Sequence, residues 1–151
     1  MTLDSKGIVP INHINQPKPL LPNYKIHDWI NVCLLIPIVS FFIYFHYPIL
    51  SVILFSISYL FSTFFLSPDL DTDSKPYHRW NILRIFWWPY KSLMTHRGYS
   101  HNLIVGPLLL GGYSLILSSP YLFLHTPTVP HELILGFIVA YDLHILVDKI
   151  L

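Results

Sequence analysis

Residues 49–74 read ILSVILFSISYLFSTFFLSPDLDTDS, a strongly apolar stretch that runs directly into three carboxylates. The apolar part, residues 49–66, falls within the roughly 17–25 residues that a helix needs to cross a bilayer. Asp69, Asp71 and Asp73 begin where it stops. Carboxylates in this position are either solvated groups at a helix end or the start of a polar site at the membrane surface.

The composition of the whole chain points to a membrane protein. Its 151 residues suffice for one domain, and 53% of them are hydrophobic while only 11% are charged. Soluble domains carry about 25% charged residues. The net charge of +1 and the lack of a basic stripe argue against a nucleic-acid partner. Cys33 is the single cysteine, which excludes an intramolecular disulfide.

The chain divides into a tail and a helical domain. Residues 1–25 are polar and contain Pro10, Pro17, Pro19 and Pro22, a pattern that discourages helix and predicts a mobile tail. Residues 26–151 are then expected to form a helical membrane domain that carries a metal site.

Four apolar stretches follow the tail, and they predict an all-α, up-and-down bundle of about four transmembrane or membrane-embedded helices. A short turn at residues 46–48 should make the first two an antiparallel hairpin. The third contains glycine and proline, and the fourth is short and carries Asp142 and His144, so complete spanning stays open for both. The stretches are residues 29–45, 49–66, 102–119 and 132–147.

Residues 67–101 separate the second stretch from the third. Trp80, Trp87, Trp88 and Tyr90 lie there among basic residues. This composition is typical of a segment at the membrane interface. A packed cap over the bundle explains it equally well, and both interpretations stay open.

The basic residues predict the orientation of the bundle. If the four stretches cross in alternation, the tail, residues 67–101 and the C-terminus share one side. The opposite connections, residues 46–48 and 120–131, contain no Lys or Arg. By the positive-inside rule, the N-terminus and the charged side are cytoplasmic. All nine basic residues fall on that side: Lys6, Lys18, Lys25, Lys75, Arg79, Arg84, Lys91, Arg97 and Lys149.

The same topology brings metal-ligand side chains from four helix ends to that cytoplasmic side. His144 and Asp148 are four residues apart and share a helix face. A structural hydrogen bond would explain such a pair alone, but ionisable groups in membrane segments are usually functional or paired. The predicted metal ligands are His27, Asp28, Asp69, Asp71, His96, His101, His144 and Asp148.

The ligand types indicate which metal to expect. The acidic run begins like a calcium loop, but that loop requires Gly near its sixth position and Glu at its twelfth. Ser74 and Trp80 occupy those positions, which excludes a calcium loop. Mixed His and Asp ligands favour zinc, with manganese or iron as alternatives. Because more ligands are available than one structural zinc uses, one or two ions are expected.

Two motifs carry a resemblance to a known family. SPDLDTDSKPYHRW (67–80) and WWPYKSLMTHRGYSH (87–101) resemble the DUF2227 type of uncharacterised metal-binding membrane proteins. The chain is more distantly similar to the YdjM-like membrane-bound metal-dependent hydrolases. The shared elements are the acidic PDxD at residues 68–71, the HRGxxH at 96–101 and the late HxxxD at 144–148. One departure is Asn102, which stands where the family pattern has Ser.

The resemblance implies a function that the ligand set by itself leaves open. It suggests a membrane-bound, metal-dependent hydrolase, and a phosphoester, possibly linked to a lipid, is the expected substrate. An analogy with the all-helical zinc-dependent phospholipase C group supports the phosphoester. Lys75, Arg79 and Arg97 are candidate substrate-binding residues, although the positive-inside bias explains them equally well. The alternative is a non-catalytic protein that binds metal for structure, sensing or transport.

Overall fold

A computed structural model describes residues 24–94, 98–125 and 129–150 of the chain. Within these ranges all regular structure is helical, so the predicted all-α class is confirmed. The predicted tail, except for its last two residues, lies outside the described part of the chain, as do His96 and Arg97.

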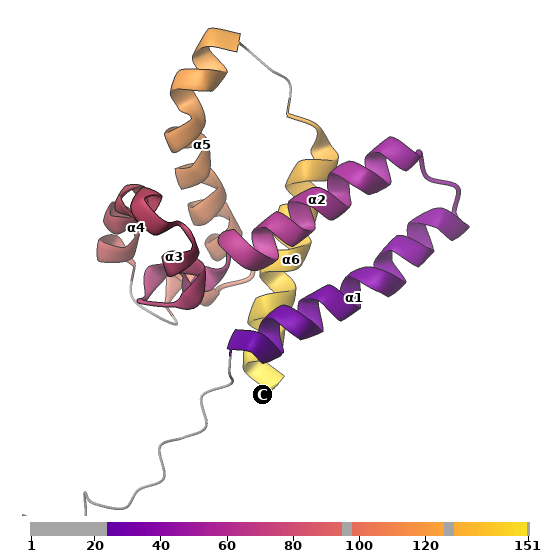
Figure 1. The fold of residues 1–151 in the computed structure, drawn as a ribbon, viewed down its shortest axis with the longest axis horizontal. Coiled ribbons are helices and arrows are strands. Elements are labelled where there is room, and N and C mark those ends of the chain that lie inside the picture. Colours follow the sequence, from indigo (N-terminus) through magenta and orange to yellow (C-terminus); the bar gives the residue numbers. More distant parts are fainter. Residues whose placement is uncertain (1–23, 95–97, 126–128, 151) are drawn as a thin grey trace, which may run out of the picture.

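Each of the four apolar stretches forms a long helix (Figure 1). The first two, α1 (Tyr24–Tyr44) and α2 (Ile49–Phe65), lie antiparallel and are joined by a tight turn in which His46 adopts a φ of 57°. The others are α5 (Val105–His125) and α6 (His131–Ile150). The predicted hairpin is therefore present.

The packing of α2 against α6 is the main helix contact of the fold. Phe55 and Tyr59 on α2 are buried against Ala140 on α6. A Cβ at Gly136 would overlap the carbonyl oxygen of Phe55, so only glycine allows this approach. Ser62 Oγ donates across the interface to the carbonyl of Phe137 at 3.2 Å, and small residues with such bonds are typical of helix contacts in membranes.

The described residues of the segment 67–101 form a series of short helices. The elements are η2 (Pro68–Asp71), α3 (Lys75–Arg79), η3 (Asn81–Trp87), α4 (Trp88–Leu93) and η4 (Tyr99–His101). Trp87 and Tyr90 are buried in one cluster with Leu110 on α5 and Tyr141 on α6. The segment therefore caps the bundle, as one of the two sequence interpretations predicts.

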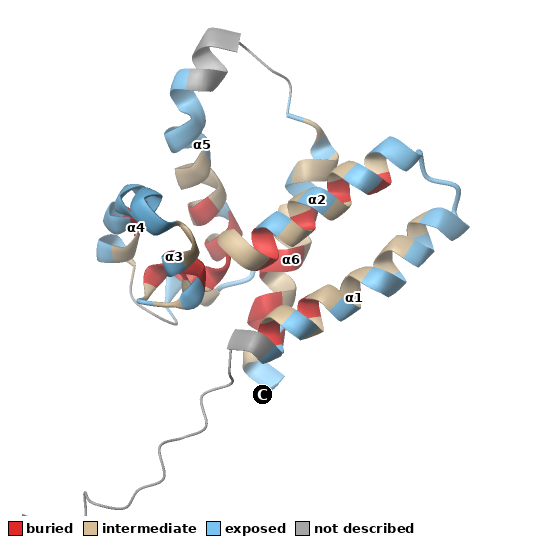
Figure 2. Ribbon diagram, viewed as in Figure 1, coloured by how far each residue is buried: buried red, intermediate tan, exposed pale blue. Residues whose placement is uncertain are grey.

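The outer face of this cap is apolar and exposed (Figure 2). Ile82, Ile85, Trp88 and Leu93 have between 63% and 82% of their surface accessible. Arg84 and Lys91 lie among them in the sequence. The segment therefore packs against the long helices on its inner side and has the exposed apolar and basic residues of an interfacial segment on its outer side.

Two segments of the described chain are long and apolar enough to cross a membrane, and four spans are not confirmed. They are Ile26–Tyr44 and Ile49–Asp71. The apolar part of α5 is shorter, at Val105–Pro120, and α6 carries Asp142, His144, Asp148 and Lys149. Figure 1 also shows α5 diverging from α2 and α6 towards its C-terminal end, so the helices do not form a regular four-helix bundle.

Candidate metal centre

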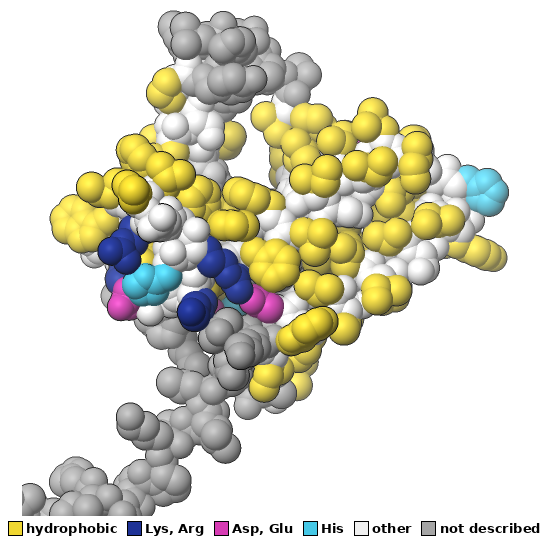
Figure 3. Space-filling view, in the orientation of Figure 1, with side chains coloured by type: hydrophobic (Ala, Val, Ile, Leu, Met, Phe, Trp, Pro, Cys, Tyr) yellow, Lys and Arg dark blue, Asp and Glu magenta, His cyan; other side chains and the backbone are white. Residues whose placement is uncertain are grey.

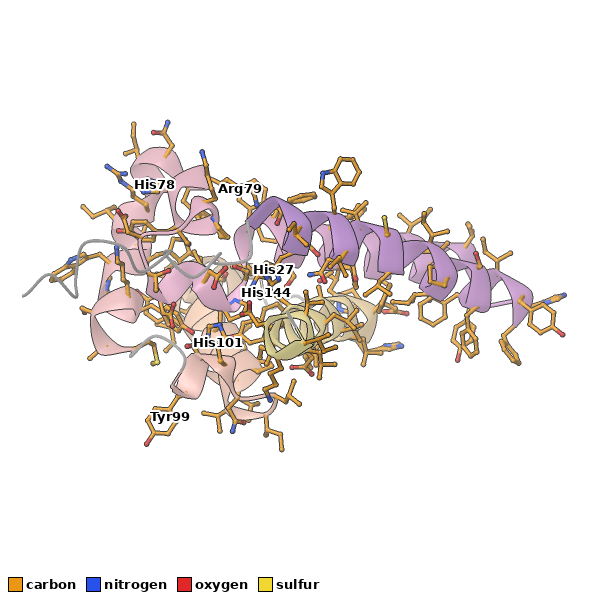
Figure 4. The ribbon with its side chains drawn as sticks, turned by 90° about the horizontal axis from the view of Figure 1, so that it is seen from below. His27, His78, Arg79, Tyr99, His101 and His144 are labelled. Atoms are coloured by element: carbon orange, nitrogen blue, oxygen red, sulfur yellow. The ribbon has the colours of Figure 1, made fainter. Side chains whose placement is uncertain are left out.

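Five His and Asp side chains from four elements meet where α1 begins and α6 ends. Figure 4 shows His27, His101 and His144 close together where these elements converge. Asp69 in η2 and Asp148 in the last turn of α6 complete the cluster, which we call the His–Asp cluster. Its members lie up to 121 residues apart in sequence (27 to 148).

The two carboxylates lie between the three imidazoles. Asp148 Oδ1 is 3.4 Å from His27 Nε2, and Asp148 Oδ2 is 3.1 Å from His101 Nε2. Asp69 Oδ2 is 3.3 Å from His144 Nε2, and Asp69 Oδ1 is 3.9 Å from His101 Nε2. Asp148 Oδ2 is also 3.8 Å from His144 Nε2, so Asp148 faces all three histidines and Asp69 faces two.

The cluster is largely shielded from solvent. The side chains of His27 and His144 are each 5% exposed, and their rings stack with centroids 4.9 Å apart. Asp148 is 15% exposed and Asp69 is 22% exposed. The remaining exposure of the cluster therefore lies mainly on the two carboxylates.

Local structure holds Asp69 in place. Pro68 opens the η2 turn, and the carbonyl of Asp69 accepts hydrogen bonds from Thr72 Oγ1 at 3.1 Å and Ser74 Oγ at 2.6 Å. These bonds use the backbone of Asp69 and fix the turn. With its backbone fixed in this turn, Asp69 places its carboxylate next to His101 and His144.

A second set of contacts positions His101. Tyr141 donates from its hydroxyl to the carbonyl of Ser100 at 2.7 Å. A Cβ at Gly106 would overlap that same carbonyl and the Tyr141 ring, so glycine is required where α5 begins. The turn that carries His101 is thus tied to α6, the helix of His144 and Asp148.

Ser100 links His101 to Asp71. Its Oγ donates to Asp71 Oδ2 at 2.6 Å and lies 3.2 Å from His101 Nδ1. A hydroxyl has one proton, and a carboxylate only accepts, so Ser100 accepts from Nδ1–H. Nε2 of the same ring faces Asp69 and Asp148 and lies within hydrogen-bond distance of Asp148 Oδ2; a metal bound there would take the place of the Nε2 proton. Metal-binding histidines are usually oriented by such an outer partner.

Two atoms of the cluster show that hydrogen bonding alone does not account for it. His144 Nε2 and His27 Nδ1 are buried, and neither has a hydrogen-bond partner among the described residues. His144 Nε2 lies 3.3 Å from Asp69 Oδ2, which is within ion-pair distance. Buried polar atoms normally find a partner, so an unmatched imidazole nitrogen facing a carboxylate suits a bound cation.

The electrostatics of Asp148 agree with this. Burial would raise the pKa of its carboxyl, but the hydrogen bond from His101 and the nearby His144 and His27 outweigh it and lower the pKa below its ordinary value. The carboxylate is therefore in the ionised form that a metal ligand requires.

The other predicted site residues do not belong to the His–Asp cluster or lie outside the described residues. Asp28 pairs with Arg79, whose Nη1 also donates to the Phe64 carbonyl at 2.9 Å. This pair joins the start of α1 to the end of α2. Asp71 contacts Ser100 as described, and Lys75 is exposed at the start of α3. His96 and Arg97 lie outside the described residues, so their roles stay predictions.

Two groups of three side chains have donor atoms close enough to hold an ion. One consists of His27, His144 and Asp148, and the other of Asp69, His101 and Asp148. Within each group the donor atoms lie within 4.8 Å of one another. Sequence reasoning did not identify Ser100 or Tyr141; the position of Ser100 next to His101 was the available signal.

Comparison with known proteins agrees with a metal centre. A relative from Aquifex aeolicus (strain VF5), described as an uncharacterized protein, is 48% identical over 56 residues. The match covers 36% of this chain and 40% of that relative. No solved structure matches the chain. The family described as "Uncharacterized metal-binding protein (DUF2227)" matches residues 22–142, which include His27, Asp69 and His101 and end before His144. The chain belongs to this family of metal-binding proteins.

Proposed function

We propose that this protein is a membrane-bound, metal-dependent hydrolase that cleaves a phosphoester at the cytoplasmic face. The observation that carries the proposal is the His–Asp cluster, in which four separate elements bring five ligand-type side chains together. Buried carboxylates need a partner, and a cation held among these five side chains would be one.

The ligand set suits a catalytic ion. Each group offers three protein ligands, the number that catalytic zinc sites use while they keep a position open. When bound, such an ion lowers the pKa of water and polarises a phosphoryl oxygen. Imidazole and carboxylate ligands favour zinc, and manganese and iron are alternatives. Ser100 and Asp71 contact the Nδ1 side of His101, so its Nε2 would be the atom that binds an ion.

The exposed surface supports a membrane location. Only 11% of the first candidate span and 28% of the second are buried, whereas a core helix of a soluble protein is mostly buried. Figure 3 shows hydrophobic side chains over α1 and α2, with the Lys and Arg side chains gathered near α3 and α4. In a bilayer the basic end would face the cytoplasm.

The basic residues near the cluster support an anionic substrate. Lys75 is exposed on α3, and Arg79 lies at the end of the same helix. A guanidinium presents five N–H donors, so the contacts of Arg79 with Asp28 and Phe64 leave further donors for phosphate oxygens. Arg97 is a third candidate. A phosphoester in a lipid headgroup would lie at the depth of this end of the molecule.

The test is hydrolysis of bis(para-nitrophenyl) phosphate by the detergent-purified protein loaded with zinc or manganese. We expect metal-dependent turnover that His101→Ala abolishes. His78→Ala is the matched control, because His78 is exposed and pairs with Asp73 outside the cluster. Stoichiometric metal without turnover on phosphate monoesters, diesters or phospholipids would contradict the hydrolase and favour a non-catalytic metal-binding role.

The membrane location has its own test. The protein should stay in the membrane fraction after alkaline extraction, and reporters fused at either terminus should be cytoplasmic. Release by alkali would contradict the location without affecting the metal site.

A further inference from the structure

The His–Asp cluster contains more donors than one ion uses. Contacts of 3.1–3.9 Å link its five side chains, and zinc in proteins is almost always four-coordinate. A single catalytic ion with three protein ligands would leave two of the five side chains without a role. Their burial makes surplus ligands costly.

The way the donors divide is set by Asp148. It is the one residue common to both groups of three. Its Oδ1 faces His27 at 3.4 Å, and its Oδ2 faces His101 at 3.1 Å. Oδ2 also lies 3.8 Å from His144, at a longer distance than from His101, so the closest histidine of each oxygen belongs to a different group.

We infer that Asp148 bridges two divalent cations, one held by His27 and His144 and the other by Asp69 and His101. The inference rests on the metal binding in the proposed function and extends it to the number of ions and the role of each ligand. Two-metal hydrolytic sites hold their ions about 3.5–4 Å apart, a spacing that one carboxylate spans with its two oxygens.

The fold accounts for this division. His144 and Asp148 lie one helical turn apart on α6, so this helix serves both ions. The start of α1 adds His27 on one side, and the η2 and η4 turns add Asp69 and His101 on the other. The stacked rings of His27 and His144 keep the two histidines of the first group together.

Asp69 also lies between histidines of both groups, at 3.9 Å from His101 and 3.3 Å from His144. It is the rival bridge, and the experiment must separate it from Asp148. Asp148 approaches all three histidines, whereas Asp69 approaches two, and this favours Asp148 as the bridge.

The experiment measures zinc per chain by elemental mass spectrometry after dialysis of the full-length, detergent-purified protein against buffered zinc. We expect two ions in the native protein, one in His27→Ala, one in Asp69→Ala and fewer than one in Asp148→Ala. His78→Ala should retain two, as a histidine outside the cluster. Circular dichroism checks that each variant stays helical, and Asp148→Asn replaces Asp148→Ala should the latter fail to fold.

A second readout uses Mn²⁺ in place of zinc. Electron paramagnetic resonance should show a spin-coupled pair in the native protein and the spectrum of an isolated Mn²⁺ in His27→Ala. One ion per chain in the native protein, lost in every ligand variant, would overturn the two-ion centre and leave the proposed function standing. One ion kept in Asp148→Ala but none in Asp69→Ala would overturn the bridging role of Asp148. No bound ion at all would overturn both proposals.

Discussion

Asp69 and Asp73 lie four residues apart in one acidic run, and each faces a histidine, yet their surroundings differ. The Asp69 side chain is 22% exposed and lies between His101 and His144. The Asp73 side chain is 73% exposed and pairs with His78 at 3.1 Å and Lys91 at 3.5 Å. The comparison teaches that a His–Asp pair becomes a candidate site when several elements enclose it.

The energetics of the two places differ for the same reason. Exposed ion pairs such as that of Asp73 contribute about 0.2–1 kcal/mol, because water and salt screen them. Enclosed carboxylates and imidazoles are less screened, so they interact strongly with each other and with a cation. Asp71, between the two, is buried and acts through Ser100.

The largest effect should separate these two carboxylates directly. Asp69→Ala should weaken metal binding at its position by at least about 100-fold, since even an outer partner of a ligand contributes 10–100-fold. Titration of the purified protein with zinc against a fluorescent chelator measures this. Asp73→Ala is the matched control and should bind zinc like the native protein. Equal losses of zinc affinity in both variants would contradict the difference between the two carboxylates.

The next effect concerns the link between Asp71 and His101. Ser100→Ala should lower metal affinity about 10–100-fold, because His101 loses the acceptor that orients it. The same zinc titration measures the loss. Ser67→Ala is the control: Ser67 is also buried, but its Oγ has no hydrogen-bond partner among the described residues. A loss of similar size in Ser67→Ala would indicate a general packing effect instead.

The enclosure itself depends on how closely α2 approaches α6. Gly136→Ala should lower the free energy of unfolding by about 1–3 kcal/mol, because its Cβ meets the Phe55 carbonyl. Thermal unfolding in detergent reports the change. At Gly112 a Cβ meets nothing within 4 Å, so Gly112→Ala should stabilise α5 by up to about 1 kcal/mol. Opposite signs for these two variants are the critical result.

The smallest effect on stability is expected at the exposed ion pair between Lys91 and Asp73. Lys91→Ala removes a partner of Asp73 and a cation above the Tyr77 ring, 4.5 Å from its centroid. We expect a loss of less than about 1 kcal/mol that shrinks further as salt is added. Thermal unfolding at low and high salt measures it. A larger loss that persists at high salt would show that this surface is more than a screened ion pair.

Much of the helical framework was predictable from the sequence. The four apolar stretches became α1, α2, α5 and α6, because apolar runs of this length fold as helices whether in a bilayer or a core. The convergence of His27, Asp69, His101 and His144 also followed, since helices that alternate in direction bring their polar ends to one side.

Other features could not be predicted from the sequence, for physical reasons. The short helices of residues 67–101 escaped because Pro and aromatic residues obscure a helical pattern over a few residues. The number of membrane spans could not be predicted, because α6 carries polar residues of the His–Asp cluster and because length alone does not distinguish a span from a packed helix.

By itself, the sequence determined that the chain is helical, that it is unusually apolar and which residue types could hold a metal, because periodicity and composition are local properties. Only the tertiary structure decided that Asp69 enters the His–Asp cluster, that Asp71 acts through Ser100 and that Asp73 pairs on the surface. Three alternating carboxylates look equivalent in a sequence. They become different only in the fold, where His144 of α6 and His101 of η4 approach Asp69, Ser100 of η4 bonds to Asp71, and Asp73 stays on the surface.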